Sequence, residues 1–359
     1  MALHVRGVLL PDDEVRDLWL VGDRVTFEPQ PGAETVVDGG FVLPGLVDAH
    51  CHPGIAPGGA PAESVEQARG FALVDRDAGV LAIRDAGSPL PYAELDDDPE
   101  MPRLIRAGRH IAAPRRYLRN TAVEVEAADV PATVAEQAKA GNGWVKLVGD
   151  WIDRGAGDLA PTWDAATLTA AVEAAHAAGA RAAVHTFSEE GVEIMVRAGV
   201  DSVEHGTGLS PDVIDEMARR GTAFVPTMIN ILTFGDIASQ AEGKFPGYAA
   251  HMRALRDRNP EVVRSAFEAG VPIYVGTDAG GGIAHGEAAE EMMLLHTMAG
   301  MPAEAVLAAA SWGARIWLGL PGLVEGGLAD LVVYDTDPRS DLRVVRAPRR
   351  IVLRGRVLR

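Results

Sequence analysis

The sequence predicts an α/β protein: a (β/α)8 barrel of the TIM type with a small β-sandwich domain built from both ends of the chain. Between residues 44 and 323, short apolar segments alternate with Ala-rich segments of helical periodicity, which is typical of βαβ units and a parallel sheet. Both ends of the chain contain short β-like segments instead. The length of 359 residues is sufficient for one large and one small domain.

The two ends of the chain share one pattern. Segments such as LHVRGVLL and VRDLWLVG near the start, and RRIVLRGRVLR at the end, are separated by Pro, Asp and Gly and lack helical periodicity. We therefore expect residues 1–43 and 324–359 to form the β-sandwich, and residues 44–323 to form the barrel.

The central region contains eight apolar segments that end in Gly or a polar residue, as buried strands do. They are LVDAH, VLAIRDAG, RLIRAG, WVKLVG, RAAVHTF, SVEHG, AFVPTM and IYVGTD. Eight βα units over roughly 280 residues match a closed barrel, whose active site lies at the C-terminal ends of the strands. The long segment 230–260 follows the seventh strand, and we expect it to cover or line the site.

Candidate metal ligands lie at the ends of these segments. They are His50, His52, Lys146, His185, His205 and Asp278. Alternate residues of a strand project to one side, so His50 and His52 are expected to share a metal. A lone strand-end histidine is often an ordinary hydrogen-bonded residue, and an aspartate in the position of Asp278 often caps a helix. Four aligned histidines favour the metal site.

Lys146 lies between Val145 and Leu147 in a predicted central strand, where a charged amine is costly to bury. An ammonium group binds no metal, but an amine that has reacted with carbon dioxide becomes a carbamate, whose two oxygens can bridge two cations. The alternative is that Lys146 extends to the barrel rim or pairs with Asp85 or Asp150.

The ordered motifs PGLVDAHCH, VKL, VH, EHG and GTD resemble the amidohydrolase superfamily over nearly the whole chain. The resemblance is closest to the prolidase-like and imidazolonepropionase-related members of its two-metal branch. It implies that His50, His52 and Asp278 hold one divalent metal ion and that His185 and His205 hold a second. Imidazole and carboxylate ligands without thiolate favour zinc, although manganese, cobalt or iron also fit.

The resemblance further implies that carboxylated Lys146 and a hydroxide bridge the two metal ions. Asp278 would accept the hydroxide proton and pass it to the departing amine. We therefore expect hydrolysis of a C–N amide bond in a linear or cyclic amide, an N-acyl amino acid or a dipeptide.

Other functions remain open on the same framework. One is a deaminase of heterocycles, and another is a lactonase or phosphotriesterase. Deaminases of this superfamily typically use one metal and lack the bridging lysine, so Lys146 argues against them. A non-catalytic scaffold is a further alternative, but here every ligand of the motif is present.

The predicted substrate contacts come from loops. The loop APRRYLRN places Arg115 and Arg116 beside Tyr117, and we expect guanidinium groups there to bind a substrate carboxylate. A solvated basic loop is the alternative, and the T-G-G-H stretch of prolidase-like relatives is missing here. Further contacts expected beyond strand ends are Trp151, Thr227, Asn230 and His285.

Several neighbouring residues are expected to play supporting roles. Cys51 should point away from the metals, because it lies between two ligands on a strand. Asp85 and Glu204 are expected to orient ligands or support the structure. His176 lies in an Ala-rich segment and is expected to be structural.

Charge and composition predict the partners. Acidic residues number 51 against 33 basic ones, and the net charge of -18 disfavours nucleic acid and anionic membranes. The single cysteine and the lack of a basic, then apolar, leader indicate the cytoplasm, and no apolar run is long enough to cross a membrane. We expect a small-molecule substrate and leave a homo-oligomer open.

Overall fold

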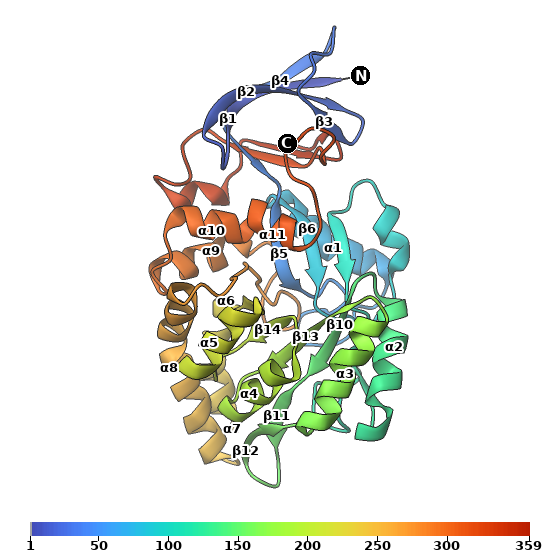
Figure 1. Ribbon diagram of the computed structural model, residues 1–359, viewed down its shortest axis with the longest axis vertical. Coiled ribbons are helices and arrows are strands. Elements are labelled where there is room, and N and C mark those ends of the chain that lie inside the picture. Colours follow the sequence, from blue (N-terminus) through green and yellow to red (C-terminus); the bar gives the residue numbers. More distant parts are fainter. Residues whose placement is uncertain (1) are drawn as a thin grey trace.

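The computed structural model describes residues 2–359, which form an α/β fold, as predicted. One sheet lies at an end of the molecule, and helices surround the other strands (Figure 1). Among the described residues, no helix is both long and apolar enough to cross a membrane.

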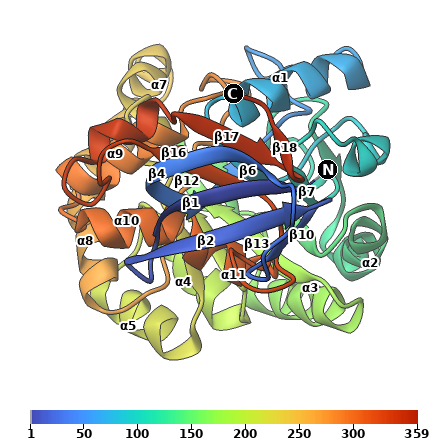
Figure 2. The same ribbon diagram turned by 90° about the horizontal axis from the view of Figure 1, so that it is seen from above.

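The end sheet combines strands from both ends of the chain, in the order β18-β17-β16-β4-β1-β2-β3. Its strands are β1 (Leu3–Leu9), β2 (Glu14–Val21), β3 (Arg24–Thr26), β4 (Glu34–Pro44), β16 (Leu331–Tyr334), β17 (Arg350–Leu353) and β18 (Arg356–Val357). Strand β4 joins the two halves, since it pairs in parallel with β1 and antiparallel with β16. The sheet crosses the molecule when seen from above (Figure 2). The division into one domain of residues 1–43 and 324–359 and another of residues 44–323 stays a prediction.

Two further sheets are parallel. The first has the order β5-β6-β7 and the second the order β15-β14-β13-β10-β8-β9. Their strands are β5 (Leu46–Cys51), β6 (Val80–Asp85), β7 (Arg103–Arg106), β8 (His110–Ala112), β9 (Ala122–Glu124), β10 (Trp144–Val148), β13 (Arg181–Thr186), β14 (Ser202–His205) and β15 (Ala223–Val225). The first seven predicted strands thus exist, and the third is followed closely by the unpredicted β8, which pairs with β10.

The predicted eighth strand is irregular. Residues 273–278 form no regular strand, but the Tyr274 amide donates to the carbonyl of Phe224 in β15 at 3.0 Å. The Ala49 amide of β5 donates to Val275 at 2.8 Å. This segment therefore connects the two parallel sheets, and its backbone turns left-handed at its last residue, Asp278, with φ of 60°.

The helices follow the strands, as βαβ units require. They are α1 (Val65–Asp77), α2 (Val130–Ala140), α3 (Ala165–Ala177), α4 (Glu189–Ala198), α5 (Pro211–Arg220), α6 (Met228–Ile231), α7 (Phe234–Ala241), α8 (Pro246–Glu268), α9 (Ala288–Thr297), α10 (Ala303–Ala310) and α11 (Trp312–Trp317). Short 3-10 helices span Ala93–Asp97, Ala127–Asp129 and Leu342–Arg346. Side-chain caps begin several helices; Ser64, Asp164 and Ser188 each accept from an amide of the first turn.

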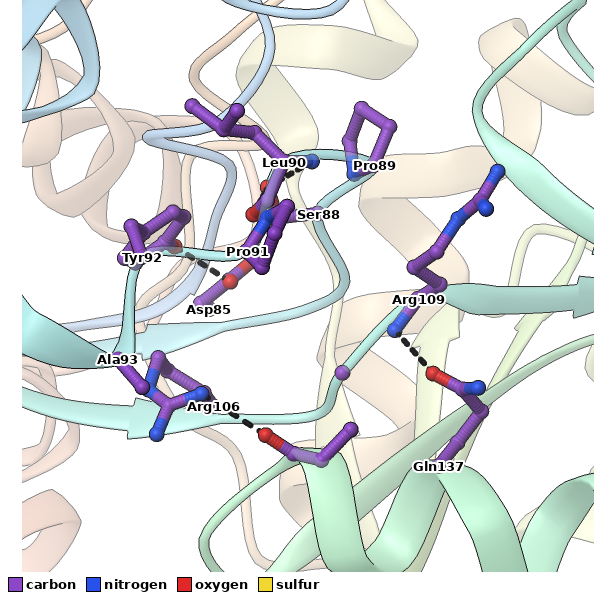
Figure 3. A pocket seen from close by; sticks show the side chains of 12 residues that line it. Asp85, Ser88, Pro89, Leu90, Pro91, Tyr92, Ala93, Arg106, Arg109 and Gln137 are labelled. Carbon is purple, nitrogen blue, oxygen red and sulfur yellow. Dashed lines mark hydrogen bonds between the residues drawn. The ribbon is translucent and has the colours of Figure 1, made fainter. Parts of the chain in front are cut away.

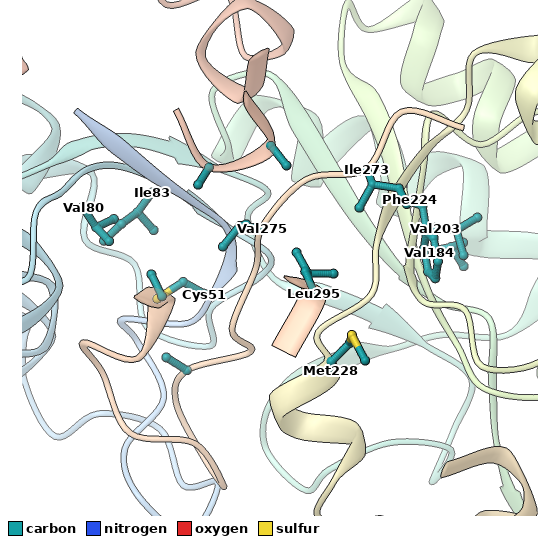
Figure 4. Packing of buried hydrophobic residues seen from close by; sticks show 14 of the residues in the cluster. Cys51, Val80, Ile83, Val184, Val203, Phe224, Met228, Ile273, Val275 and Leu295 are labelled. Atoms are coloured by element: carbon teal, nitrogen blue, oxygen red, sulfur yellow. The ribbon is translucent and has the colours of Figure 1, made fainter. Parts of the chain in front are cut away.

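The main core packs the parallel strands against the helices. Figure 4 shows residues of this core, including Cys51, Ile83, Val184 and Leu295. Because strand residues alternate, the neighbours of Cys51 in sequence, His50 and His52, lie on the opposite face of β5. The apolar face holds the strands in place, and the other face carries the polar residues of the site.

The segment that was expected to cover the site is largely helical. It contains the end of α6, all of α7 and most of α8, and the helices pack against a hairpin of β11 (Asp150–Asp153) and β12 (Asp158–Pro161). An apolar cluster joins these parts around Phe187, Phe234, Tyr248 and Met252. We call this assembly of α6, α7, α8 and the β11–β12 hairpin the cover.

Candidate metal centre

Lys146 occupies the middle of β10 and is completely buried. Its Nζ atom has no hydrogen-bond partner within residues 2–359. Burial lowers the pKa of its amine to about 8, against the opposing effect of Glu204. The two aspartates proposed as alternative partners are engaged elsewhere: Asp85 accepts from Tyr92, and Asp150 accepts from Ser188. Pairing with an aspartate therefore does not explain this buried amine.

Three candidate ligand atoms converge at the ends of β5 and of segment 273–278. The Nε2 atoms of His50 and His52 lie 3.2 Å apart. The Asp278 Oδ1 atom lies 3.2 Å from His50 Nε2 and 3.0 Å from His52 Nε2. Strand alternation brings the two imidazoles together, as predicted.

The hydrogen bonds of the two imidazoles indicate which nitrogens are free. His52 Nδ1 lies 2.8 Å from the carbonyl oxygen of Gly87, which only accepts, so Nδ1 carries the proton. His50 Nδ1 lies 2.7 Å from a carboxylate oxygen of Glu204. In the neutral rings both Nε2 atoms then present lone pairs toward each other and toward Asp278. Three converging acceptors suit a cation, so these residues fit a metal ion.

The electrostatics of Asp278 agree with this interpretation. Burial alone raises the pKa of its carboxyl, but the neighbouring imidazole of His50 outweighs burial and holds that pKa well below its usual range. Burial and nearby Lys146 lower the pKa of His50. A carboxylate beside neutral imidazoles is the protonation state in which all three bind a metal.

His185 and His205 lie side by side, with ring centroids 4.7 Å apart. His205 Nδ1 is 2.7 Å from the hydroxyl of Thr227, whereas His185 Nε2 is buried without a partner in the described chain. The His205 ring is also 5.0 Å from that of His50. These two histidines therefore adjoin the group of His50, His52 and Asp278.

Glu204 is held by a buried network. Arg84 donates to both of its carboxylate oxygens, at 2.8 and 2.7 Å, and Ser202 donates at 2.6 Å. Burial raises the pKa of Glu204, but Arg84, Lys146 and His50 outweigh burial and hold it well below the usual range. Glu204 thus orients His50 from another strand, in the supporting role predicted for it.

Sequence reasoning missed Asp48 and His110. Asp48 is fully buried and accepts from the amide and the hydroxyl of Thr277, at 3.1 and 2.5 Å, and so fixes the residue before Asp278. The sequence feature that could have identified Asp48 is its position two residues before His50, on the same side of the strand. His110 carried no signal, because it lies in a strand that the apolar pattern did not predict.

The backbone is unusual at the site. His205, Thr227 and Asp278 all have positive φ, of 68°, 47° and 60°. Such conformations are uncommon outside glycine and cluster at functional sites. Gly276 allows close contact, since a Cβ there would lie 2.7 Å from the Cβ of His50.

Three predicted substrate contacts lie near the centre. The rings of Tyr117 and Trp151 are 5.6 and 5.4 Å from that of His185, and 4.9 Å from each other. Asn230, on α6 of the cover, donates to the second oxygen of Asp278 at 2.6 Å. These residues form an aromatic wall and a polar contact beside the metal ligands.

The other predicted substrate contacts either bond to other groups of the protein or lie at its surface. Arg115 is exposed. Arg116 pairs with Asp153 at 2.8 Å and donates to main-chain carbonyls of the β11–β12 hairpin, so it fixes the hairpin. Thr227 contacts His205 and supports a ligand. Of the two arginines expected to bind a substrate carboxylate, Arg116 is thus engaged by the hairpin, and binding by Arg115 stays a prediction.

His285 also requires a correction. Its Nδ1 lies 2.8 Å from Asp75, and its ring stacks on Phe71 of α1. Cys51 Sγ is 3.7 Å from the same ring nitrogen. Because Cys51 points away from the metal ligands, as predicted, His285 lies behind β5 and does not face the centre.

A separate cavity of about 330 Å³ lies beside β6 and β7 (Figure 3). It is lined by Asp85, Ser88, Pro89, Leu90, Pro91, Tyr92, Ala93, Arg106, Gly108, Arg109, Gln137 and Ala140. Asp85 is held there by the hydroxyl of Tyr92 at 2.5 Å. None of the six candidate metal ligands belongs to this lining, although Asp85 lies 3.9 Å from Nδ1 of His52.

Comparisons with known proteins agree with the motifs. The model of the amidohydrolase family matches residues 41–358. An uncharacterised protein of Mycobacterium tuberculosis is 52% identical over 355 residues, covering 99% of this chain and 95% of that protein. The ochratoxinase of Aspergillus niger is 31% identical over 173 residues, covering 46% of this chain and 35% of that enzyme. A solved Xaa-Pro dipeptidase is similar with a TM-score of 0.81 and 25% identity, covering 99% of this chain and 98% of that one.

Proposed function

We propose, because the chain belongs to the amidohydrolase family and is a hydrolase acting on C–N bonds, that it cleaves an amide with the help of two divalent metal ions. The observation that carries this proposal is Lys146, a buried amine without a partner in residues 2–359, whose charge acts on His50, His185 and His205. A carbamate on Lys146 would place an anionic metal ligand beside the histidine nitrogens whose lone pairs are free to bind a metal ion. The similarity to an ochratoxinase and a Xaa-Pro dipeptidase supports an amide substrate.

We also propose that the parallel strands close into the predicted (β/α)8 barrel. Three observations support closure: β7 pairs with β6, β8 pairs with β10, and segment 273–278 bonds to both β15 and β5. In a closed barrel these links would bring every ligand-bearing strand end to one mouth.

The residues that would hold the first ion are His50, His52 and Asp278, and His185 and His205 would hold the second. Carboxylated Lys146 would lie between them. When bound, the two ions would supply an activated water molecule and polarise the substrate carbonyl. The donor set favours zinc.

The side chains of this protein handle the proton. Asp278 Oδ1 faces the ligand histidines, while its Oδ2 accepts from Asn230, which fixes the plane of the carboxylate. We assign Asp278 the transfer of a proton from the attacking water to the leaving amine. The cover shields this transfer from bulk water, because its apolar cluster reaches Phe187, beside His185.

The proposal is tested by metal content and by carbamate detection. We expect near two zinc ions per chain after expression with zinc and bicarbonate, and a carbamate signal in ¹³C NMR after incubation with labelled bicarbonate. Lys146→Ala should lose both the signal and metal, while the exposed Lys139→Ala should lose neither. One ion or none in the parent protein would overturn the two-metal mechanism.

Substrate class is tested separately with a panel of amides. Release of 4-nitroaniline from N-acyl 4-nitroanilides, and of amino acids from N-acyl amino acids and dipeptides, measures turnover directly. Turnover of esters or aminoheterocycles without any amide turnover would contradict amide hydrolysis.

A further inference from the structure

His110 is a completely buried histidine on β8 with an unusual feature. Both of its ring nitrogens are buried, and neither has a hydrogen-bond partner anywhere in residues 2–359. A neutral imidazole carries one donor and one acceptor, and leaving them unpaired in the interior is costly. His296, in contrast, is a structural histidine of this chain, whose Nδ1 contacts the Met301 carbonyl at 2.8 Å.

The position of His110 places it at the metal centre. It is in register with Lys146 on the adjacent strand β10. Its ring is 5.2 Å from that of His52 and 4.9 Å from that of Tyr117. The rings of His52, His110, Tyr117 and the ligand His185 therefore follow one another around the site.

The backbone makes room for this imidazole. A Cβ at Gly87 would lie 2.7 Å from both Cε1 and Nδ1 of His110, closer than real contacts allow. Gly87 also has φ of 121°, and its carbonyl orients His52. The same residue thus positions a metal ligand and accommodates His110 next to it.

We propose that His110 is a substrate-contacting residue, whose ring donates a hydrogen bond to a carbonyl oxygen of the bound amide on the His52 side of the centre. This inference rests on the proposed amide hydrolysis. Substrate would supply the partner that the imidazole lacks in the described chain, and the cover would keep that hydrogen bond away from water.

The test compares His110→Phe with the parent protein. Phenylalanine preserves the aromatic packing with Tyr117 and removes only the polar atoms. We expect unchanged metal content, equal or higher stability in urea, and a kcat/KM for an N-acyl 4-nitroanilide lowered roughly 10- to 100-fold. His176→Phe, which removes an exposed histidine bonded to Asp201, is the matched control and should leave kcat/KM unchanged.

A second measurement does not depend on turnover. In protein labelled with ¹⁵N-histidine, titration with benzamide should shift the ring resonances that are missing from His110→Phe. Absence of that shift would overturn the proposal. Loss of metal would instead make His110 a ligand, and marked destabilisation would make it structural; either result also overturns it. Failure of the parent protein to hydrolyse any amide counts against the proposed function, while the benzamide shift still decides whether His110 contacts an amide.

Discussion

At the scale of single residues, the centre separates ligands from the groups that orient them. Asp278 combines both tasks, because one oxygen faces the ligand histidines and the other accepts from Asn230. Lys146 has no such partner within residues 2–359, and in the proposed mechanism it contributes as a carbamate. Replacements of these two residues should therefore have different effects.

Asp278→Asn should reduce kcat by about 100- to 10,000-fold, the usual contribution of a positioned general acid or base, with a smaller effect on metal content. Lys146→Ala should lower activity and metal content together. Metal analysis and kcat measured on the same preparations check this difference. If both variants lost metal equally, Asp278 would be mainly a ligand.

Glu204→Gln tests the orientation of His50. The amide keeps the shape of the side chain but removes the charge that faces Arg84 and His50, so metal affinity should fall roughly 10- to 100-fold. Competition with a chelator of known zinc affinity measures the change. Glu193→Gln, an exchange in a surface pair with Arg197, is the control and should retain the parent affinity.

At the scale of elements, His251 connects two parts of the cover, α8 and β12, with helix α4. His251 on α8 contacts Asp158 of β12 at 2.9 Å and Glu189 of α4 at 3.1 Å. Its hydrogen bond with Glu189, opposed by burial and assisted by Asp158, raises the pKa of His251 to about 9 from its ordinary 6.5. The protonated imidazole therefore stabilises this arrangement.

This raised pKa predicts a pH dependence. The folded state binds the proton more tightly than the unfolded state, so the stabilisation is fully present below pH 6.5 and is lost as pH rises through about 9. Urea unfolding at equal metal loading should show a larger loss of stability between these values for the parent than for His251→Gln. Parallel pH profiles for the two proteins would contradict the prediction.

The elements also show what the sequence reveals and what it does not. Seven strands were predictable because each is an apolar run with a polar end, and three of them carry His50, His185 and His205 at or next to that end. The β11–β12 hairpin was missed because its residues are only partly buried, and segment 273–278 was mistaken for a regular strand. The role of Arg116 depends on packing against that hairpin, far along the chain, so no local pattern indicates it.

At the scale of the whole molecule, Asp330 connects the end sheet with the parallel strands. It is completely buried and accepts from Arg103 of β7 at 2.5 Å and from Arg315 of α11 at 2.8 Å. The Arg354 amide, at the end of β17, donates to it at 2.9 Å. The C-terminal part of the end sheet and the central region thus share one buried carboxylate.

Asp330→Ala should lower the free energy of unfolding by about 3–5 kcal/mol, because it leaves buried arginine charges without their partner. Asp330 joins the end sheet to Arg103 and Arg315 of the central region. We therefore expect one cooperative unfolding transition at a lower Tm, measured by calorimetry. Asp257→Ala, which removes an exposed pair with Arg256 on α8, should leave Tm nearly unchanged. A separate early transition of the end sheet would show that the two regions unfold independently.

The left-handed backbone at His205, Thr227 and Asp278 has a consequence for laboratory evolution. Each such conformation costs on the order of 1–3 kcal/mol in a residue other than glycine. Selection for heat tolerance alone would favour glycine or asparagine at these positions and would erode the centre while improving the fold. A library for thermostable variants should therefore hold these three codons fixed and screen for metal retention alongside survival.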